Sequence, residues 1–245
     1  MIEKFKKFAE IINSYRIKRN RLKVELPILL KNYNIINVLE VGSNLRPLCD
    51  ESIRKTYSLN LHGIDPDSAI DKTMAKKKFD YFEITDLESY STENKYDLIL
   101  LNMVMEHIED NNISFKKLKG LLSDKGVIVS WQPSNLHPFS LLNQFLPHDF
   151  KEKVLRIFLP WSKPGARGWK SYYHKCNYLG FKNLCKKNSL VIKKAKFNYN
   201  ASHYFSFFPP LFLLIVLYEE IVRLLGIKLL CSDFWVEISH DNKNG

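Results

Sequence analysis

Two acidic residues stand in or directly after short apolar segments in the first third of the chain, and a glycine follows the first. Glu40 lies in the apolar segment 37–41, Gly42 follows it, and the second segment ends at Asp65, 23 positions after Gly42. A glycine after the first strand of an α/β sheet lets the backbone approach a ligand, and the helix that follows points free N–H groups at it. A carboxylate after the second strand can accept hydrogen bonds from ribose hydroxyls. The spacing therefore predicts a site for an adenosine-containing cofactor.

The glycine turn is incomplete, because Asn44 and Arg46 stand where glycine-rich cofactor turns have further glycines. The acid in the first strand and the absence of a full Gly-x-Gly-x-x-Gly argue against a dinucleotide pyrophosphate. Asparagine adopts positive φ more readily than most residues, so we expect the turn to form at Asn44. Arg46 leaves the detailed shape of the loop open.

Composition indicates a globular intracellular chain. With 245 residues, 45% hydrophobic and 26% charged, it can form one well-buried domain with additions. The N-terminus lacks the apolar core of a signal peptide, so none is expected. The cysteines lack Cys-x-x-Cys spacing, which predicts reduced thiols in a cytoplasmic protein and no zinc site. They are Cys49, Cys176, Cys185 and Cys231.

The net charge of +11 is concentrated in two segments. Residues 1–32 carry nine Lys and Arg against three Glu, and residues 151–175 carry seven against one, so each holds +6. The rest of the chain then sums to −1. Two readings stay open, a solvated surface or contact with an anionic surface or substrate.

Apolar runs alternate with helical patterns along the chain. Strands are expected at residues 37–41, 58–64, 79–84, 96–101, 127–131, 190–197 and 231–239, and helices near residues 3–20, 28–32, 46–57, 113–122, 172–179 and 210–225. Pro27 is expected to break or restart the first helical segment. The alternation predicts an α/β fold with a doubly wound, mostly parallel, seven-stranded Rossmann-like sheet.

Five motifs occur in an order and spacing that one family shares. They are Glu40-Val41-Gly42-Ser43-Asn44, Asp65, Thr85-Asp86-Leu87, the stretch from Tyr96-Asp97-Leu98-Ile99 to Met105-Glu106-His107-Ile108, and Leu121-Leu122-Ser123-Asp124-Lys125-Gly126-Val127. Over roughly residues 35–135 the chain resembles the class I S-adenosylmethionine-dependent methyltransferases. It is most similar to the small-molecule, methyltransferase type 11-like kind that includes quinone methyltransferases.

The resemblance implies a methyltransferase with S-adenosyl-L-methionine as cofactor, and it implies roles for single residues. Gly42, Ser43 and Asn44 would pack against the methionine moiety, Glu40 would order the loop or meet the amino group, Asp65 would bind the ribose, Asp86 and Leu87 the adenine, and Asn102 would line the methionine side. Each acid also has a structural alternative, since Glu40 and Asp65 could cap helices and Asp86 could be an ordinary N-cap. His107 is a candidate base or a structural histidine in equal measure.

The domain organisation expected is a basic amphipathic helical segment over residues 1–32 and a methyltransferase domain over residues 33–240. A lid over about residues 133–175 would frame the acceptor with aromatic and basic side chains. Its aromatic and histidine side chains are His137, Phe139, His148, Trp161, Trp169, Tyr172 and Tyr173. Such a lid suits a partly apolar or anionic acceptor, small or lipid-linked, such as a glycan, lipid or quinone precursor. His137, His148 and His174 are further candidates for a base, and no metal is expected.

The apolar helix expected at about residues 208–225 is too short for a membrane span, which needs about 20 residues. The favoured interpretation is a crossover helix that covers the sheet. The alternative is peripheral contact with the inner face of a membrane, together with the basic N-terminal segment.

Two other functions compete. Positive charge suggests an RNA methyltransferase, but residues 102–105 read Asn-Met-Val-Met where enzymes that methylate base amines carry Asn/Asp-Pro-Pro-aromatic, and no Pro-Cys pair occurs. Nucleic acid is therefore the less favoured partner. Asn44 and Arg46 suggest a noncatalytic cofactor-binding module.

Overall fold

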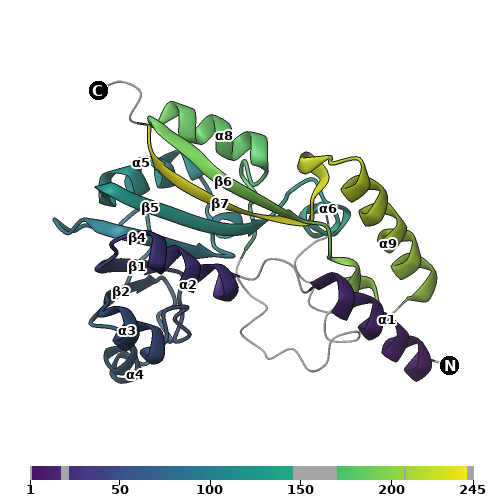
Figure 1. The fold of residues 1–245 in the computed structure, drawn as a ribbon, viewed down its shortest axis with the longest axis horizontal. Helices are drawn as coiled ribbons and strands as arrows, with labels where there is room; N and C mark the ends of the chain where they lie inside the picture. The colour runs from purple at the N-terminus through teal and green to yellow at the C-terminus, as the bar shows by residue number, and fades with distance from the viewer. Residues whose placement is uncertain (1, 18–21, 146–169, 207, 242–245) are drawn as a thin grey trace.

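A computed structural model describes residues 2–17, 22–145, 170–206 and 208–241 (Figure 1). Its centre is one seven-stranded sheet with the order β3-β2-β1-β4-β5-β7-β6. The strands are β1 Asn37–Val41, β2 Asn60–Asp65, β3 Tyr81–Ile84, β4 Tyr96–Asn102, β5 Leu122–Pro133, β6 Leu190–Asn198 and β7 Asp233–His240.

Neighbouring strands from β3 to β5 are parallel, and β7 runs antiparallel to both β5 and β6. The chain starts in the middle of the sheet, builds outward through β2 and β3, and then returns to place β4 on the other side of β1. Ligands of open α/β sheets bind at such a switch point, beyond the carboxyl ends of the strands. The predicted doubly wound, mostly parallel sheet is confirmed.

The middle strands are apolar because they are buried on both faces. Val38 and Leu98 are paired across β1 and β4 and belong to one hydrophobic cluster, while the next pair, Leu39 and Ile99, belongs to the other. All four side chains are fully buried. Successive side chains of a strand point to opposite faces, so these two pairs separate the two layers of the core.

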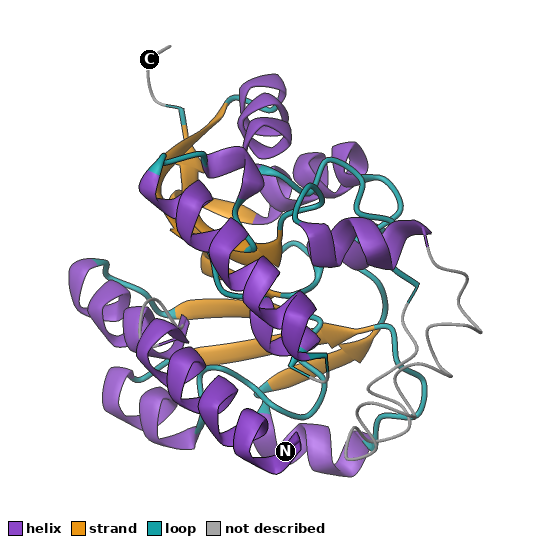
Figure 2. Ribbon diagram, turned by 90° about the vertical axis from the view of Figure 1, so that its right-hand side faces the viewer, coloured by secondary structure: helices purple, strands orange, loops and turns teal. Residues whose placement is uncertain are grey.

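Helices lie on both sides of the strands (Figure 2). The α-helices are α1 Ile2–Ile17, α2 Leu22–Asn32, α3 Glu51–Tyr57, α4 Lys72–Lys78, α5 Asn111–Leu121, α6 Pro138–Phe145, α8 Tyr178–Lys187 and α9 Pro209–Leu224, and the 3-10 turns are η1 Met105–His107, η2 Ser202–Phe205 and η3 Lys228–Leu230. Side chains of α5 and α8 join the cluster of Leu39, and those of α2 join the cluster of Val38.

Two predicted helices begin later than expected. The helix near residues 46–57 starts at Glu51, because Asp50 caps it by accepting a hydrogen bond from the Ile53 N–H. The helix near residues 172–179 was misplaced, since α8 starts at Tyr178 with Asn177 as its cap. Gly180 lies inside α8, where a Cβ would be 2.3 Å from the Lys175 carbonyl oxygen, so glycine permits a close approach of two backbones.

Pro27 and the turn residues 124–126 both lie inside elements. Pro27 lies inside α2 and does not break it. The turn at residues 124–126 forms a bulge within β5, because Tyr96 pairs with Leu122 while Leu98 pairs with Val127.

The remaining helix, α9, confirms the apolar helix predicted near residues 210–225 but not its predicted place. It lies with α1 beyond one end of the sheet, where its main contacts among the described elements are η2 and η3. The interpretation that it covers the sheet is therefore wrong. None of the described helices is both long and apolar enough to cross a membrane.

Candidate functional site

The loop after β1 requires residues that tolerate a left-handed backbone. Gly42 has φ +65°, and a Cβ there would lie 2.6 Å from a methyl carbon of Val104. Any other residue would meet both strain and a collision at this position. Asn44 has φ 45°, which confirms that asparagine forms the turn where a glycine is missing.

Glu40 lies beneath this loop and holds it in place. Its side chain is buried, and its two carboxylate oxygens accept hydrogen bonds from the Leu48 and Cys49 N–H groups, at 2.9 and 2.7 Å. Burial raises the pKa of Glu40, and the two backbone N–H groups oppose that rise. Of the two roles considered for Glu40, this geometry favours ordering the loop.

Asp65 joins the loops after β1 and β2. Its side chain is buried, Oδ2 accepts a hydrogen bond from the Asn44 N–H at 2.8 Å, and Oδ1 accepts one from the Asp67 N–H at 3.0 Å. Each carboxylate oxygen can accept more than one hydrogen bond, so Asp65 can still receive ligand hydroxyls.

A cavity of about 550 Å³ opens over these strand ends. It is lined by Val41, Gly42, Ile64, Asp65, Pro66, Thr85, Asp86, Leu87, Glu88, Ser89, Met103, Val104, His107, Ile108, Glu109, Lys170 and Tyr172. We call it the first cavity. Four of the predicted cofactor residues line it, namely Gly42, Asp65, Asp86 and Leu87. Its size lies in the usual range for sites that hold small ligands.

The other predicted cofactor residues lie outside the lining. Glu40, Ser43 and Asn44 form or support the loop behind Gly42, and Asn102 is replaced at the cavity wall by its neighbour Met103. The backbone turns at Met103, with φ 55°, while its N–H still donates to the Trp131 carbonyl in the sheet. A residue count along the strand could not reveal that turn.

Asp86 caps a turn and also lines the first cavity. Its Oδ1 accepts a hydrogen bond from the Ser89 N–H at 2.7 Å, as in an ordinary cap, and the residue is exposed at the wall of the first cavity. Leu87 beside it is buried.

A second cavity of about 600 Å³ adjoins the first, and Met103 and His107 line both. Its other lining residues are Glu106, Trp131, Pro133, Phe139, Asn143, Ser171, Tyr173, Asn198, Asn200, Ala201, His203, Tyr204, Ser232 and Asp233. The described lining contains no Lys or Arg. It combines aromatic rings with amide, hydroxyl and carboxyl groups.

His107 stands where the two cavities meet. Its Nδ1 lies 3.1 Å from the Lys170 carbonyl oxygen. A carbonyl can only accept, so Nδ1 carries the proton and a neutral ring keeps its lone pair on Nε2. Burial lowers the pKa of His107, partly opposed by the bond to Lys170. The ring is therefore neutral near pH 7 and able to accept a proton.

Glu106, which sequence reasoning missed, lies beside His107. The residue is 5% exposed and lines the second cavity, and its Oε1 lies 3.9 Å from His107 Nε2. Burial raises the pKa of Glu106 to about 8. The available signal was an acid within an otherwise mostly apolar stretch, Met103 to Ile108, directly after a buried strand.

Asp233, in the wall of the second cavity, is also held by hydrogen bonds. Asp233 Oδ1 accepts bonds from Trp131 Nε1 at 2.6 Å and from Asn198 Nδ2 at 2.7 Å. Burial raises the pKa of Asp233, and these bonds oppose the rise. Nearby, the rings of Phe139 and Tyr204 stack with their centroids 3.9 Å apart.

The other candidate histidines lie away from both cavities or outside the described residues. His137 is buried, with Nε2 3.4 Å from Glu219, and His174 lies 3.3 Å from Asp110. His148, Trp161 and Trp169 fall outside the described residues, whereas Tyr172 lines the first cavity and Tyr173 the second. His203, which the sequence did not single out, lines the second cavity.

A family model described as a methyltransferase domain matches residues 8–184, which are 177 of the 245 residues. The chain belongs to this methyltransferase-domain family. The predictions of an enzyme, of a class I S-adenosylmethionine-dependent methyltransferase and of S-adenosylmethionine as its cofactor are thereby confirmed.

One curated relative is the malonyl-[acyl-carrier protein] O-methyltransferase 2 of Ilyobacter polytropus, 24% identical over 131 residues. The match covers 51% of this chain and 50% of the relative, so the chain spans about half the length of the curated relative it matches.

Solved structures of low sequence identity share the fold. One is the plantazolicin methyltransferase BamL in complex with a triazolic desmethylPZN analog and SAH, with a TM-score of 0.54, 14% identity, and coverage of 96% of this chain and 91% of that one. Another is phosphoethanolamine N-methyltransferase 2 of Haemonchus contortus in complex with S-adenosyl-L-methionine, with a TM-score of 0.54, 14% identity, and coverage of 95% and 56%.

Proposed function

We propose that this methyltransferase binds its donor in the first cavity and an acceptor in the second, and transfers the methyl group where they meet. The acceptor proposed is small or lipid-linked and is methylated on oxygen or carbon, as in a glycan, lipid or quinone precursor. The single observation that carries the proposal is the junction of the two cavities at Met103 and His107.

The first cavity fits a nucleoside sulfonium. In the proposal Asp65 accepts hydrogen bonds from the ribose hydroxyls and Asp86 accepts one from the adenine amine, beside Leu87. Gly42 and Val104 line the wall beside the methionine moiety, and a side chain at position 42 would collide with Val104. Glu40, Ser43 and Asn44 keep the loop in the shape that presents Gly42.

The second cavity favours a hydroxyl-bearing acceptor over an anionic one. Glu106 and Asp233 lie in its wall, and no cation does among its described residues. Amide and hydroxyl groups with stacked aromatic rings suit a polar, partly apolar molecule. The basic segment expected to attract an anion lies mainly in residues 151–169, outside the described ranges.

S-adenosylmethionine supplies an electrophilic methyl group on sulfur, so no fixed triad is needed. The contribution of the protein is to hold the acceptor oxygen in line with that methyl group and to remove its proton. His107 is proposed as the base, with Nε2 as the acceptor of the proton. The bond from Nδ1 to the Lys170 carbonyl orients the ring and stabilises the charged form that results.

The proposal is tested by titrating S-adenosylmethionine into the protein by calorimetry and then supplying labelled donor with lipid extract, with glycan extract or with cellular RNA. A labelled product in either extract supports the proposal, and donor binding with a labelled product only on RNA would favour the rival nucleic-acid enzyme. The expected cytoplasmic location stays a prediction.

A further inference from the structure

The outer face of α9 is apolar although it faces solvent. The exposed side chains are Leu213 at 48%, Leu214 at 61%, Leu217 at 58%, Ile221 at 46%, Leu224 at 74% and, directly after the helix, Leu225 at 68%. Between them Arg223 and Glu220 form an ion pair with each other at 2.6 Å. A helix at the surface of a soluble domain usually presents polar residues outward.

The inner face of α9 is complete without these leucines. Phe212, Ile215 and Val222 are buried there. Their spacing of three and seven residues forms one stripe of the helix, and the exposed leucines belong to the rest of its circumference. The outer leucines are therefore not needed to hold α9 on the protein.

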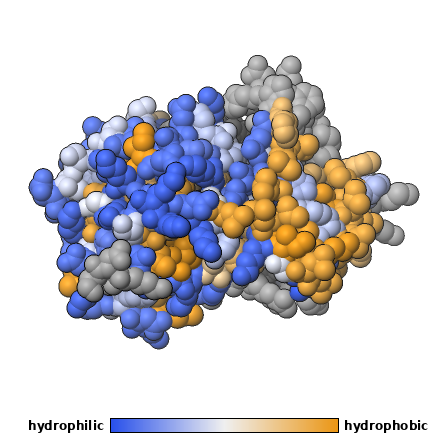
Figure 3. Space-filling view, turned by 90° about the horizontal axis from the view of Figure 1, so that it is seen from above, coloured by the Kyte–Doolittle hydropathy of each residue, from blue (hydrophilic) through white to orange (hydrophobic). Residues whose placement is uncertain are grey.

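The apolar surface extends onto α1. The rings of Phe5 on α1 and Phe212 on α9 meet edge to face with centroids 5.5 Å apart. On α1, Phe8 is 47% exposed and Ile11 is 57% exposed. Figure 3 shows hydrophobic side chains gathered at the end of the molecule where Figure 1 places α1 and α9, while the opposite end is mainly hydrophilic. We call this surface the α1–α9 face.

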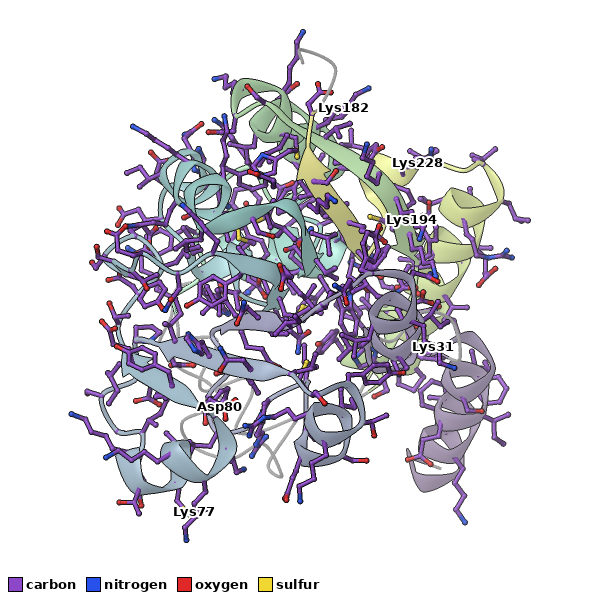
Figure 4. All side chains as sticks on the ribbon, turned by 60° about the vertical axis from the view of Figure 1, so that its left-hand side comes forward. Lys31, Lys77, Asp80, Lys182, Lys194 and Lys228 are labelled. Atoms are coloured by element: carbon purple, nitrogen blue, oxygen red, sulfur yellow. The ribbon has the colours of Figure 1, made fainter. Side chains whose placement is uncertain are left out.

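Positive charge accompanies the same face. The sequence of α1 holds four Lys and Arg against two Glu. Lys7 on α1 and Lys228, four residues after the end of α9, are exposed. Figure 4 shows Lys228 and Lys31 on the side of the molecule that carries α9. An apolar surface bordered by cations is complementary to an anionic lipid surface.

A second copy of the chain is a poorer occupant. The sequence of α1 holds four Lys and Arg against two Glu, so a symmetric dimer through this face would bring two positively charged helices together, and like charges oppose one another across an interface. An anionic bilayer covers the leucines and neutralises the lysines at once.

We propose that the α1–α9 face docks on the surface of an anionic lipid bilayer. The exposed leucines of α9 enter the boundary between headgroups and acyl chains, and Lys7 of α1 and Lys228 after α9 contact the headgroups. No helix crosses the bilayer in this arrangement.

The docked face adjoins the second cavity. Both α1 and α9 contact η2, and the η2 residues His203 and Tyr204 line that cavity. Docking would then bring the acceptor cavity close to the lipid surface, which favours a lipid-linked acceptor. This last step rests on the proposed function, whereas the docking itself does not.

Flotation of the full chain with vesicles tests the docking without donor or acceptor. The vesicles contain phosphatidylcholine alone or with phosphatidylglycerol, at low and high salt. We expect flotation with the anionic vesicles, weakened by salt. In the double variant Leu214→Glu with Leu217→Glu the bound fraction should fall by about tenfold or more, because two charges replace the side chains that enter the lipid.

The matched control is Met74→Glu with Ile113→Glu, on α4 and α5. These side chains are 41% and 53% exposed and lie outside the α1–α9 face, so this variant should float like the wild type. Both variants should keep the wild-type circular dichroism and affinity for S-adenosylmethionine, which separates lost docking from lost folding.

Two outcomes would overturn the proposal. One is a flotation result without docking through this face. Either the wild-type chain stays unbound to anionic vesicles at low salt, or the Leu214 and Leu217 variant floats as well as the wild type. The other is a dimer in light scattering that the same variant dissociates while vesicle binding is unchanged, which would assign the face to a second copy. Neither outcome bears on donor binding, so failure here leaves the proposed methyl transfer standing.

Discussion

The two cavities differ in how their walls are assembled. The first cavity is built mainly from residues 41–109. Its lining residues lie at the ends of successive parallel strands and in the loops that follow them. The second is built from residues 103 to 233, and it combines η1, the end of β5, α6, the end of β6, η2 and the start of β7. The first is the carboxyl edge of a regular sheet, whereas the second depends on segments that are distant in the sequence.

The difference in assembly goes with a difference in chemistry. In the first cavity, a glycine and acids stand in the loops that follow successive parallel strands. Their distances along the sequence therefore indicate the kind of ligand. The second presents side chains whose meeting depends on packing at the far edge of the sheet. If the donor and the acceptor occupy separate cavities, substitutions in each should affect separate steps.

The largest effect is expected for His107→Ala. Loss of a positioned base should lower kcat about a hundredfold to ten-thousandfold, with donor affinity nearly unchanged. The measurement is the initial rate of S-adenosylhomocysteine release with the acceptor fraction found in the extracts, beside donor calorimetry. His174→Ala is the control, because His174 bonds to the Asn111 N–H outside both cavities. A variant with the wild-type kcat would remove His107 from the chemistry.

The next largest effect is expected for Asp65→Ala, which should weaken the binding of S-adenosylmethionine. Hydrogen bonds to a charged group contribute about 1.5–3 kcal/mol, so the Kd for S-adenosylmethionine should rise about tenfold to a hundredfold. Asp124→Ala, at the exposed bulge of β5, is the control. An unchanged Kd with intact folding would mean that the donor does not bind in the first cavity.

Glu106→Gln should alter the dependence of stability on pH. The folded pKa of about 8 lies above the usual value of 4.5, so the folded state prefers the protonated acid. That contribution is fully present below pH 4.5 and is lost as the pH rises toward 8. Glutamine has no proton to lose, so the variant should have a higher Tm than the wild type at pH 8 and a similar one at pH 5.

The pH dependence of the rate shows which of the neighbours His107 and Glu106 acts as the base. With His107 as the base, activity should rise with pH through a value below 6.5 and then stay level, because burial lowers the pKa of His107. Glu106→Gln should keep this profile. A rate that instead rises near pH 8 and loses that rise in the variant would assign the base to Glu106.

The smallest effect is expected for Asp86→Ala. Asp86 is exposed and already bonds to the Ser89 N–H, so its hydrogen bond to an adenine amine would compete with water. We expect the Kd for S-adenosylmethionine to rise about threefold to tenfold, and calorimetry beside Asp65→Ala checks the order of the two effects. An Asp86 effect larger than that of Asp65 would indicate that contacts to the adenine contribute more to donor binding than contacts to the ribose.

The sequence by itself determined the sheet and the loop that would meet the donor. A short apolar segment predicted β1 and a continuous apolar run predicted β4, and the spacing from Gly42 to Asp65 predicted two strand ends at one edge. Asparagine at a turn position predicted its positive φ. These features are local or repeat with the sheet, so chain order is enough to place them.

Only the tertiary structure decided the second cavity and the place of α9. Burial of Glu106 and the meeting of His107 with the Lys170 carbonyl depend on segments more than 60 residues apart. The helix predicted to cover the sheet lies beyond its end, and its outer leucines remain in solvent. Periodicity tells which residues share a face of a helix, but what covers that face depends on where the chain places its neighbours.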